Sequence, residues 1–136
     1  MAGEYSVSGL AVPESLDRVQ DLLGGVRADH PEVDENDVAM FETAIVEIHG
    51  NVVQHARPEG RVVYAFSLEV LEDRIVGYLT DTGSTAPDLT GTELVDELEE
   101  SGRGLWLARS TLDELDYVRT ADRNTWRMVR LRSHVR

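Results

Sequence analysis

Three polar residues recur at steps of four in the segment 38–56, and their side chains could bind a ligand or take up a proton. They are Glu47, Asn51 and His55, within VAMFETAIVEIHGNVVQHA. Residues four apart in a helix stack in one row, and here that row runs beside an apolar stripe. Asn and His are mediocre helix formers, and Gly50 costs about 1 kcal/mol relative to Ala. Helix propensity therefore does not explain the row, which we interpret as a candidate site.

Two shorter motifs further along the chain also have residue types that could do chemistry. Asp81-x-Gly83 follows an apolar run, and Gly102-x-Gly104 precedes another. Taken singly, the first is most often a turn and the second a helix cap, although a helix N-terminus favours anions. A Glu and an Asn four apart are likewise most often a solvated pair. The three motifs carry weight only as a set.

The first third of the sequence predicts the elements that would position the polar row. Residues 4–12 alternate weakly, as in a strand, and Pro13 suits the first position of a helix that ends near Ala28. The long helix over 38–56 has a buried stripe at steps of three and four. Its apolar positions are Val38, Phe41, Ile45, Ile48 and Val52.

The remaining sequence predicts two hairpins separated by a helix. Residues 61–71 alternate with period two and return as a strand over 75–80, so the pair should be antiparallel. Residues 92–100 read as a short acidic helix or a mobile segment, and a helix is expected over 105–112. Strands over 116–120 and 125–132 form the closing hairpin. We predict an α/β (α+β) two-layer sandwich in a single domain over 1–136, with helices on one face of a mostly antiparallel, mixed sheet.

Composition excludes several kinds of site. The 136 residues contain no cysteine, which excludes disulfides, thiolate zinc sites and a cysteine nucleophile. All 13 basic residues are arginine, which excludes a P-loop lysine and Schiff-base chemistry. No apolar run reaches the roughly 18 residues needed to span a bilayer, and the N-terminus has no signal pattern, so we expect a soluble cytoplasmic protein without membrane contact.

The net charge of −13 argues against direct nucleic-acid binding, because contacts to phosphates need a basic surface. The charge is uneven, since residues 119–136 hold six arginines and one acid. We interpret this basic end as a strand face that balances an acidic body. A basic protein partner for that body remains an alternative.

As a set, the motifs resemble those of the Bergerat-fold ATP-binding domain, the GHKL superfamily of gyrase-like, chaperone, histidine-kinase and mismatch-repair ATPases. More narrowly, the chain resembles the bacterial anti-sigma-factor serine/threonine kinases of the RsbW/SpoIIAB type. EIHGNVVQHA corresponds to the N box, DTG to the first glycine box and SGRGLWLARS to the second. Thr125 corresponds to the last strand signature, a Gly-Thr pair in which Asn124 stands in place of glycine.

The resemblance implies a site for ATP and Mg²⁺. Asn51 would hold the metal, which prefers oxygen ligands, and Glu47 would act as general base. Asp81 would accept a hydrogen bond from the adenine amino group, with Gly83 and Thr125 close to the base. The phosphates would meet the N-terminus of the second glycine box, formed by Gly102, Arg103, Gly104 and Leu105, where Arg103 is the candidate for positive charge.

The resemblance also implies a function and partners. The chain would phosphorylate a STAS-type anti-anti-sigma factor on Ser or Thr, sequester a sigma factor and form a homodimer, using a surface near residues 13–28 with Arg18 and Arg27 as candidate contacts. Two alternatives stay open: an ATP-binding partner-switch module without phosphotransfer, and a detached histidine-kinase ATPase domain. A fold whose motifs match by coincidence is a further possibility, which predicts no stabilisation by Mg-ATP.

Overall fold

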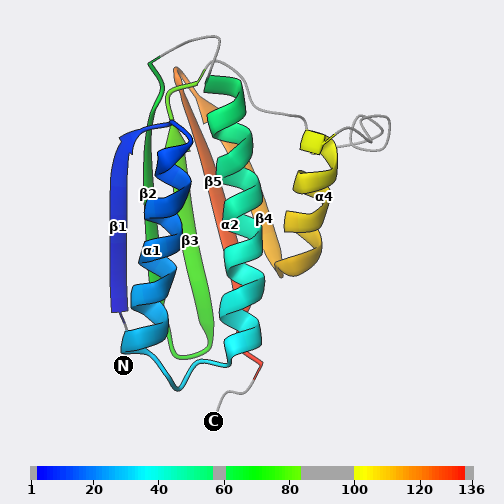
Figure 1. The fold of residues 1–136 in the computed structure, drawn as a ribbon. Helices are drawn as coiled ribbons and strands as arrows, with labels where there is room; N and C mark the ends of the chain where they lie inside the picture. Colours follow the sequence, from blue (N-terminus) through cyan, green and yellow to red (C-terminus); the bar gives the residue numbers. More distant parts are fainter. Residues whose placement is uncertain (1–2, 57–60, 84–99, 134–136) are drawn as a thin grey trace.

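The computed structural model describes residues 3–56, 61–83 and 100–133, with the backbone alone at residues 100–103. Within these residues, five strands form one sheet in the order β1-β2-β3-β5-β4, and every neighbouring pair is antiparallel. The described helices cover one face of this sheet (Figure 1). In chain order the elements are β1 (Gly3–Leu10), α1 (Glu14–Asp29), α2 (Glu35–Ala56), β2 (Val63–Val70), β3 (Arg74–Asp81), α4 (Glu100–Thr111), β4 (Glu114–Thr120) and β5 (Arg123–Leu131).

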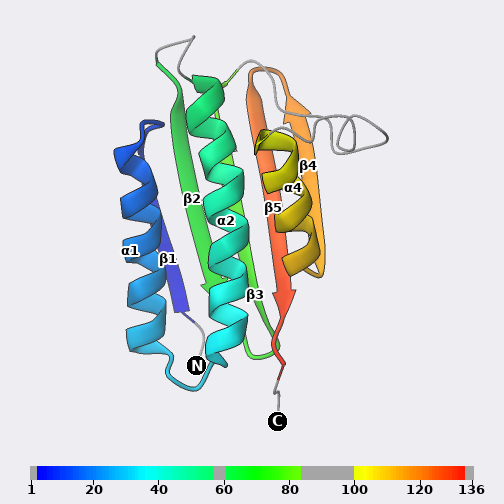
Figure 2. The same ribbon diagram turned by 45° about the vertical axis from the view of Figure 1, so that its right-hand side comes forward.

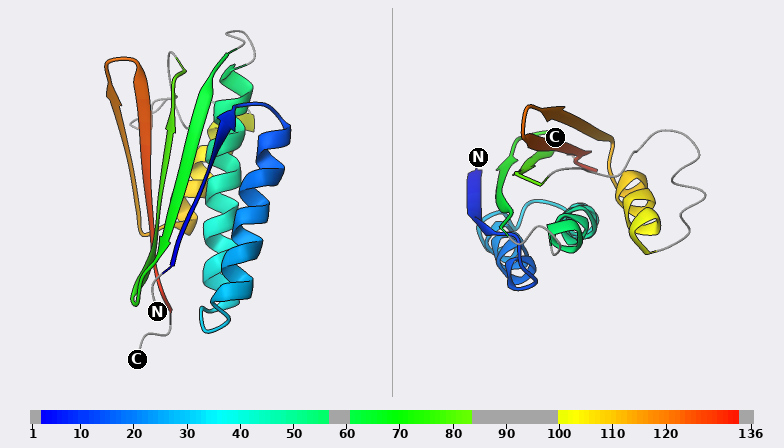
Figure 3. Two further views of the ribbon diagram at one scale, coloured as in Figure 1. Left: turned by 90° about the vertical axis from the view of Figure 1, so that its left-hand side faces the viewer. Right: turned by 90° about the horizontal axis from the view of Figure 1, so that it is seen from above.

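The helices and the sheet form two layers with the core between them. Figures 2 and 3 show α1, α2 and α4 side by side on one face of the sheet, with the opposite face open. The stripe predicted on α2 is buried, and Phe41, Ile45 and Ile48 are fully covered. They face the inward row of the strands, which includes Phe66, Leu79 and Trp126 and completes the core.

The predicted two-layer α+β architecture is confirmed, with two corrections. The sheet is antiparallel throughout the described strands rather than mixed. The helix expected over 105–112 begins at Glu100, so Gly102 and Gly104 lie inside it and not before it. Two glycines lower helix propensity, which is why the sequence alone placed the start too late. The predicted segment 92–99 lies outside the described residues.

A buried ion pair fixes the end of α2 that is farther from the polar row. The Asp37 carboxylate is fully buried and accepts hydrogen bonds from Arg130 Nε at 2.9 Å and from the Ser133 backbone N–H at 2.7 Å. Arg130 also donates to the Thr111 carbonyl oxygen at the end of α4. Burial acts to raise the pKa of Asp37, but the hydrogen bonds from Ser133 and Arg130 outweigh it, and the pKa is lowered. These contacts join α2, β5 and α4.

Within the described residues, no helix combines the length and the apolar character needed to cross a membrane.

Candidate functional site

The polar row on α2 divides into two covered residues and one exposed residue. Asn51 is 5% exposed, Glu47 is half-buried and His55 is exposed in the last turn. The Asn51 Nδ2 donates to the Glu47 backbone carbonyl oxygen at 3.4 Å, a long hydrogen bond. The Asn51 Oδ1 is buried and accepts no hydrogen bond from any described residue. An unpaired buried acceptor is costly, so this oxygen marks a place where a ligand would bind.

Helix α4 packs against α2 at Glu47. A Cβ atom added to Gly104 would overlap the Glu47 Oε1 atom, so only glycine lets the α4 backbone approach the carboxylate this closely. Because α4 begins at Glu100, the N–H groups of its first turn are the ones without partners inside the helix, whereas those of Gly104 and Leu105 lie beyond that turn. The structure thus brings Glu47 and Gly104 together and places the helix N-terminus about a turn earlier than predicted.

The other residues of the second glycine box, Gly102, Arg103 and Leu105, also lie within α4. Gly102 lies in the first turn of α4, where backbone N–H groups have no carbonyl partner within the helix, a position that favours an anion. Leu105 is fully buried and contributes its side chain to the core. The Arg103 side chain lies outside the described part of the chain.

Asp81 closes the end of β3 with a buried carboxylate. Its Oδ1 accepts hydrogen bonds from the Gly83 backbone N–H at 2.8 Å and from Asn124 Nδ2 at 2.9 Å. Asn124 Nδ2 also donates to the Gly83 carbonyl oxygen at 3.0 Å. Asp81 and Asn124 are register partners across β3 and β5, so both side chains lie on the helix-covered face. Asp81 and Gly83 are therefore brought together as expected, with Asn124 as a third member.

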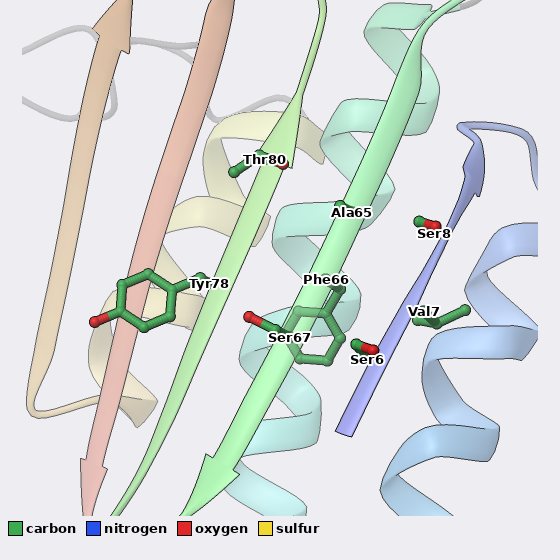
Figure 4. Close-up of a pocket in the computed structure, with 8 residues that line it drawn as sticks. All are labelled: Ser6, Val7, Ser8, Ala65, Phe66, Ser67, Tyr78 and Thr80. Atoms are coloured by element: carbon green, nitrogen blue, oxygen red, sulfur yellow. The ribbon is translucent and has the colours of Figure 1, made fainter. Parts of the chain in front are cut away.

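The structure does not bring Thr125 to Asp81. Thr125 pairs with Thr80, and because side chains alternate along a strand, both lie on the face away from the helices. Figure 4 shows Thr80 on that open face. Asn124 occupies the inward position instead. The sequence pattern that indicates an inward Asn124 is the alternation of Asn124, Trp126 and Met128. In this pattern a polar residue stands at the start of a series of buried apolar residues.

A second buried polar residue on α2, His49, was also absent from the sequence prediction. His49 is fully buried, its Nε2 lies 2.7 Å from Ser15 Oγ, and its ring packs on Tyr64 with centroids 4.4 Å apart. Burial lowers the pKa of His49 to about 4. It lies two residues from both Glu47 and Asn51, on another side of the helix, which is why the spacing of four did not reveal it. Its contacts are with α1 and β2.

The candidate contacts on α1 are placed differently from each other. Arg27 forms ion pairs with Glu35 and Glu42 of α2, at 3.0 and 2.7 Å. Arg18 is exposed, and its guanidinium lies near Gly9 and Tyr64. Arg27 thus serves the packing of α1 on α2, and Arg18 is the more accessible of the two.

The open face of the sheet carries a hollow that is separate from this site. It has a volume of about 510 Å³, and Figure 4 shows Ser6, Ser8, Ser67 and Tyr78 around it on β1, β2 and β3. The residues predicted for the nucleotide site, apart from Thr125, come from α2, α4 and the end of β3 on the helix-covered side. The hollow therefore does not belong to the candidate site.

The residues on the helix-covered face fit a nucleotide with a hard cation. The unpaired Asn51 Oδ1 is an oxygen ligand of the kind that Mg²⁺ prefers. Near Asp81, a Cβ on Gly83 would lie 2.8 Å from the carboxylate oxygen, so the absence of a side chain keeps that edge open. In Figure 1, the C-terminal ends of α2 and β3 and the N-terminal end of α4 lie toward the same end of the molecule.

Comparisons with known proteins agree with the fold. A family model described as the histidine kinase-like ATPase domain matches residues 10–130. The fold is similar to the crystal structure of the RsbU and RsbW domains of Rv1364c from Mycobacterium tuberculosis, with a TM-score of 0.68 and 19% sequence identity. That similarity covers 98% of this chain and 34% of the other, so this chain spans about a third of the matched one. No curated protein sequence gave a match.

Proposed function

This chain belongs to the family of histidine kinase-like ATPase domains, and from that premise we propose that it is an ATP-dependent serine/threonine kinase and anti-sigma factor. Its substrate would be a STAS-type anti-anti-sigma factor, and its second partner a sigma factor that it sequesters. The nucleotide would be ATP with Mg²⁺.

One observation carries the nucleotide-binding part of the proposal: the Asn51 Oδ1 is buried, has no partner among the described residues and lies one helical turn from Glu47. Asn51 would hold Mg²⁺, which when bound neutralises the charge of the phosphates. Gly104 lets α4 approach Glu47, and the N–H groups of the first turn of α4, which have no carbonyl partner within the helix, would face the phosphates. Asp81 would accept a hydrogen bond from the base amino group.

The chemistry assigned to this chain is the removal of one proton. Glu47 would accept the proton of a serine or threonine hydroxyl as that oxygen forms a bond to the γ-phosphorus. The bond from the γ-phosphorus to the β,γ-bridging oxygen breaks in the same step, and ADP leaves with the bonding electrons. Because the chain contains no lysine, backbone N–H groups, the metal and Arg103 would stabilise the transferred charge.

The partners are supported by likeness and by charge. The matched structure contains an RsbW domain, and the motifs of this chain resemble the same type of protein. We also propose a homodimer, as in that type. The accessible Arg18 on α1 is the better of the two candidate contacts, because Arg27 is already paired with two glutamates of α2.

The test is incubation with γ-labelled Mg-ATP and a STAS-domain protein, scoring label on Ser or Thr. Glu47→Gln should lower the transfer rate about 100- to 10,000-fold, the usual contribution of a general base, while ATP still binds. Glu69→Gln, on the open face of the sheet, is the matched control and should transfer at the wild-type rate. Equal transfer by Glu47→Gln would contradict the assignment of the base.

Two other outcomes would contradict the kinase proposal itself. ATP binding without transfer to any such hydroxyl would indicate a binding module that switches partners. Label on a partner histidine would indicate an ATPase domain that serves a histidine kinase.

A further inference from the structure

Asn124 makes every hydrogen bond that its side-chain amide can make. It is fully buried at the start of β5. Its Nδ2 donates to Asp81 Oδ1 and to the Gly83 carbonyl oxygen, at 2.9 and 3.0 Å. Its Oδ1 accepts from the Tyr117 hydroxyl at 2.5 Å and from Arg119 at 2.8 Å. An amide has two donor hydrogens and two acceptor lone pairs, so its capacity is filled.

These partners also fix which way the amide faces. The Arg119 guanidinium on β4 can only donate and the Asp81 carboxylate can only accept, so the amide oxygen faces β4 and its nitrogen faces Asp81. The Tyr117 hydroxyl, also on β4, donates to the same oxygen. Arg119 makes a second bond of 2.7 Å to the Gly83 carbonyl oxygen. Burial raises the pKa of Tyr117, although Arg119 acts against this, so its hydroxyl keeps its proton at neutral pH. We call Tyr117, Arg119 and Asn124 the amide clamp.

The clamp acts on one oxygen of Asp81 and leaves the other available. Asp81 Oδ1 receives the N–H groups of Gly83 and Asn124, whereas Oδ2 makes no hydrogen bond to the described residues. Two donors on one oxygen also fix the rotation of the carboxylate. The carboxylate then presents a single acceptor in a set direction, and a group that binds it must donate.

We infer that Asn124, held by Tyr117 and Arg119, is a positioning residue that sets the base specificity of the site. The inference rests on the proposed nucleotide site and deepens it. A purine with a 6-amino group donates to the directed oxygen of Asp81, whereas a purine with a 6-oxo group would put an acceptor against it. Asn124 itself has no free hydrogen-bonding group and does not contact the base through its amide.

The experiment measures the affinity of three Mg-nucleotides by calorimetry: ATP, GTP and purine riboside triphosphate, which lacks the amino group. The wild type should bind ATP about 10- to 100-fold more tightly than purine riboside triphosphate, the range for a hydrogen bond to a charged group. It should bind GTP more weakly still, because the 6-oxo group of guanine would place a hydrogen-bond acceptor against the Asp81 carboxylate oxygen.

Asn124→Ala should reduce the preference for ATP over purine riboside triphosphate to less than about fivefold, mainly by weakening ATP. Tyr117→Phe removes one donor that holds the amide and should reduce the preference by a smaller factor. This second variant decides the question if Asn124→Ala does not fold. Thr80→Val, next to Asp81 but on the open face, is the control and should keep the wild-type preference.

A merely structural role for Asn124 predicts that its loss weakens the nucleotides by the same factor and leaves their ratio unchanged. An unchanged ratio in folded Asn124→Ala or Tyr117→Phe would overturn the inference while leaving the proposed function intact. Absence of ATP binding by the wild type would instead overturn the proposed function, and the inference with it.

Discussion

Asn124 and Asn51 are both buried, but their side-chain amides differ in the number of hydrogen bonds that they make. Asn124 has four hydrogen-bond partners, whereas Asn51 has a long bond from its nitrogen and an oxygen without a partner among the described residues. A filled amide stabilises the structure around it, and an unfilled buried oxygen costs free energy until a ligand binds. The contrast supports a positioning role for Asn124 and a ligand-binding role for Asn51.

His49 gives a prediction about pH at the residue scale. The single proton of the Ser15 hydroxyl goes to the Val12 carbonyl oxygen at 2.6 Å, so His49 Nε2 donates to Ser15. Burial of the ring keeps it neutral at pH 7. Burial lowers the pKa of His49 from 6.5 to about 4. The unfolded chain therefore takes up a proton at higher pH than the folded chain, and stability is lost as pH falls from about 6.5 toward 4.

Between pH 7 and 5 this loss should be about 2 kcal/mol, from about 1.4 kcal/mol for each pH unit below 6.5. Urea unfolding at the two pH values measures it. His49→Gln, which has no group titrating in this range, should show a pH dependence smaller by that amount. The same pH dependence in the variant and the wild type would contradict the buried neutral histidine.

At this scale, spacing predicted some residues and missed others for a geometric reason. Glu47 and Asn51 were predictable because a step of four in a helix puts side chains on one face. Thr125 was predicted from the resemblance and not from spacing. On a strand, neighbouring side chains lie on opposite faces, so Thr125 lies on the open face while Asn124 lies beside Asp81. His49 lies among the buried apolar positions of α2, and the sequence pattern alone does not distinguish such a residue from a core residue.

At the scale of elements, the contact of α2 with α4 depends on a glycine. Gly104→Ala would force the Glu47 carboxylate to move, because the added Cβ overlaps its Oε1 atom. The carboxylate is the far end of a flexible side chain, and Ala favours a helix by about 1 kcal/mol, so the fold should not be destabilised. Under the kinase proposal, displacement of the base should lower the transfer rate about 100-fold.

Gly50 on α2 is the matched control, because nothing lies within 4 Å of a Cβ added there. Gly50→Ala should raise the free energy of unfolding by up to about 1 kcal/mol without slowing transfer. Urea unfolding and transfer assays on both variants separate stability from activity. Full activity in Gly104→Ala would mean that the position of Glu47 against α4 is unimportant.

The elements themselves were largely predictable because their hydrophobic periods are strong. The buried stripe on α2 and the alternation in β2 follow directly from burial on one face. The start of α4 was not predictable, because Gly102 and Gly104 lower the local helix propensity. Packing of α4 on α2 is a tertiary interaction that supplies what local propensity lacks.

At the scale of the whole molecule, the basic C-terminal end is largely used within the fold. Arg127 pairs with Glu114 and Asp116, and Arg130 with Asp37. Arg119 and Arg132 donate to backbone carbonyl oxygens. These contacts favour the interpretation that the basic end balances an acidic body. The acidic residues are in excess, so the net charge of the whole chain is −13. The acidic body remains the part available to a basic partner.

We propose that Asn51, Glu47 and Asp81 surround a Mg-ATP site, and calorimetric titration with Mg-ATP measures whether the nucleotide binds there. We predict saturable binding of one ATP per chain, with affinity that falls when Mg²⁺ is removed by chelation and when Asn51 is replaced by alanine. In the Asn51→Ala variant, chelation should make little further difference, because the metal ligand is already gone. Absence of saturable binding by the wild type would contradict the Mg-ATP site, and the same Mg²⁺ dependence with and without Asn51 would contradict its role as the metal ligand.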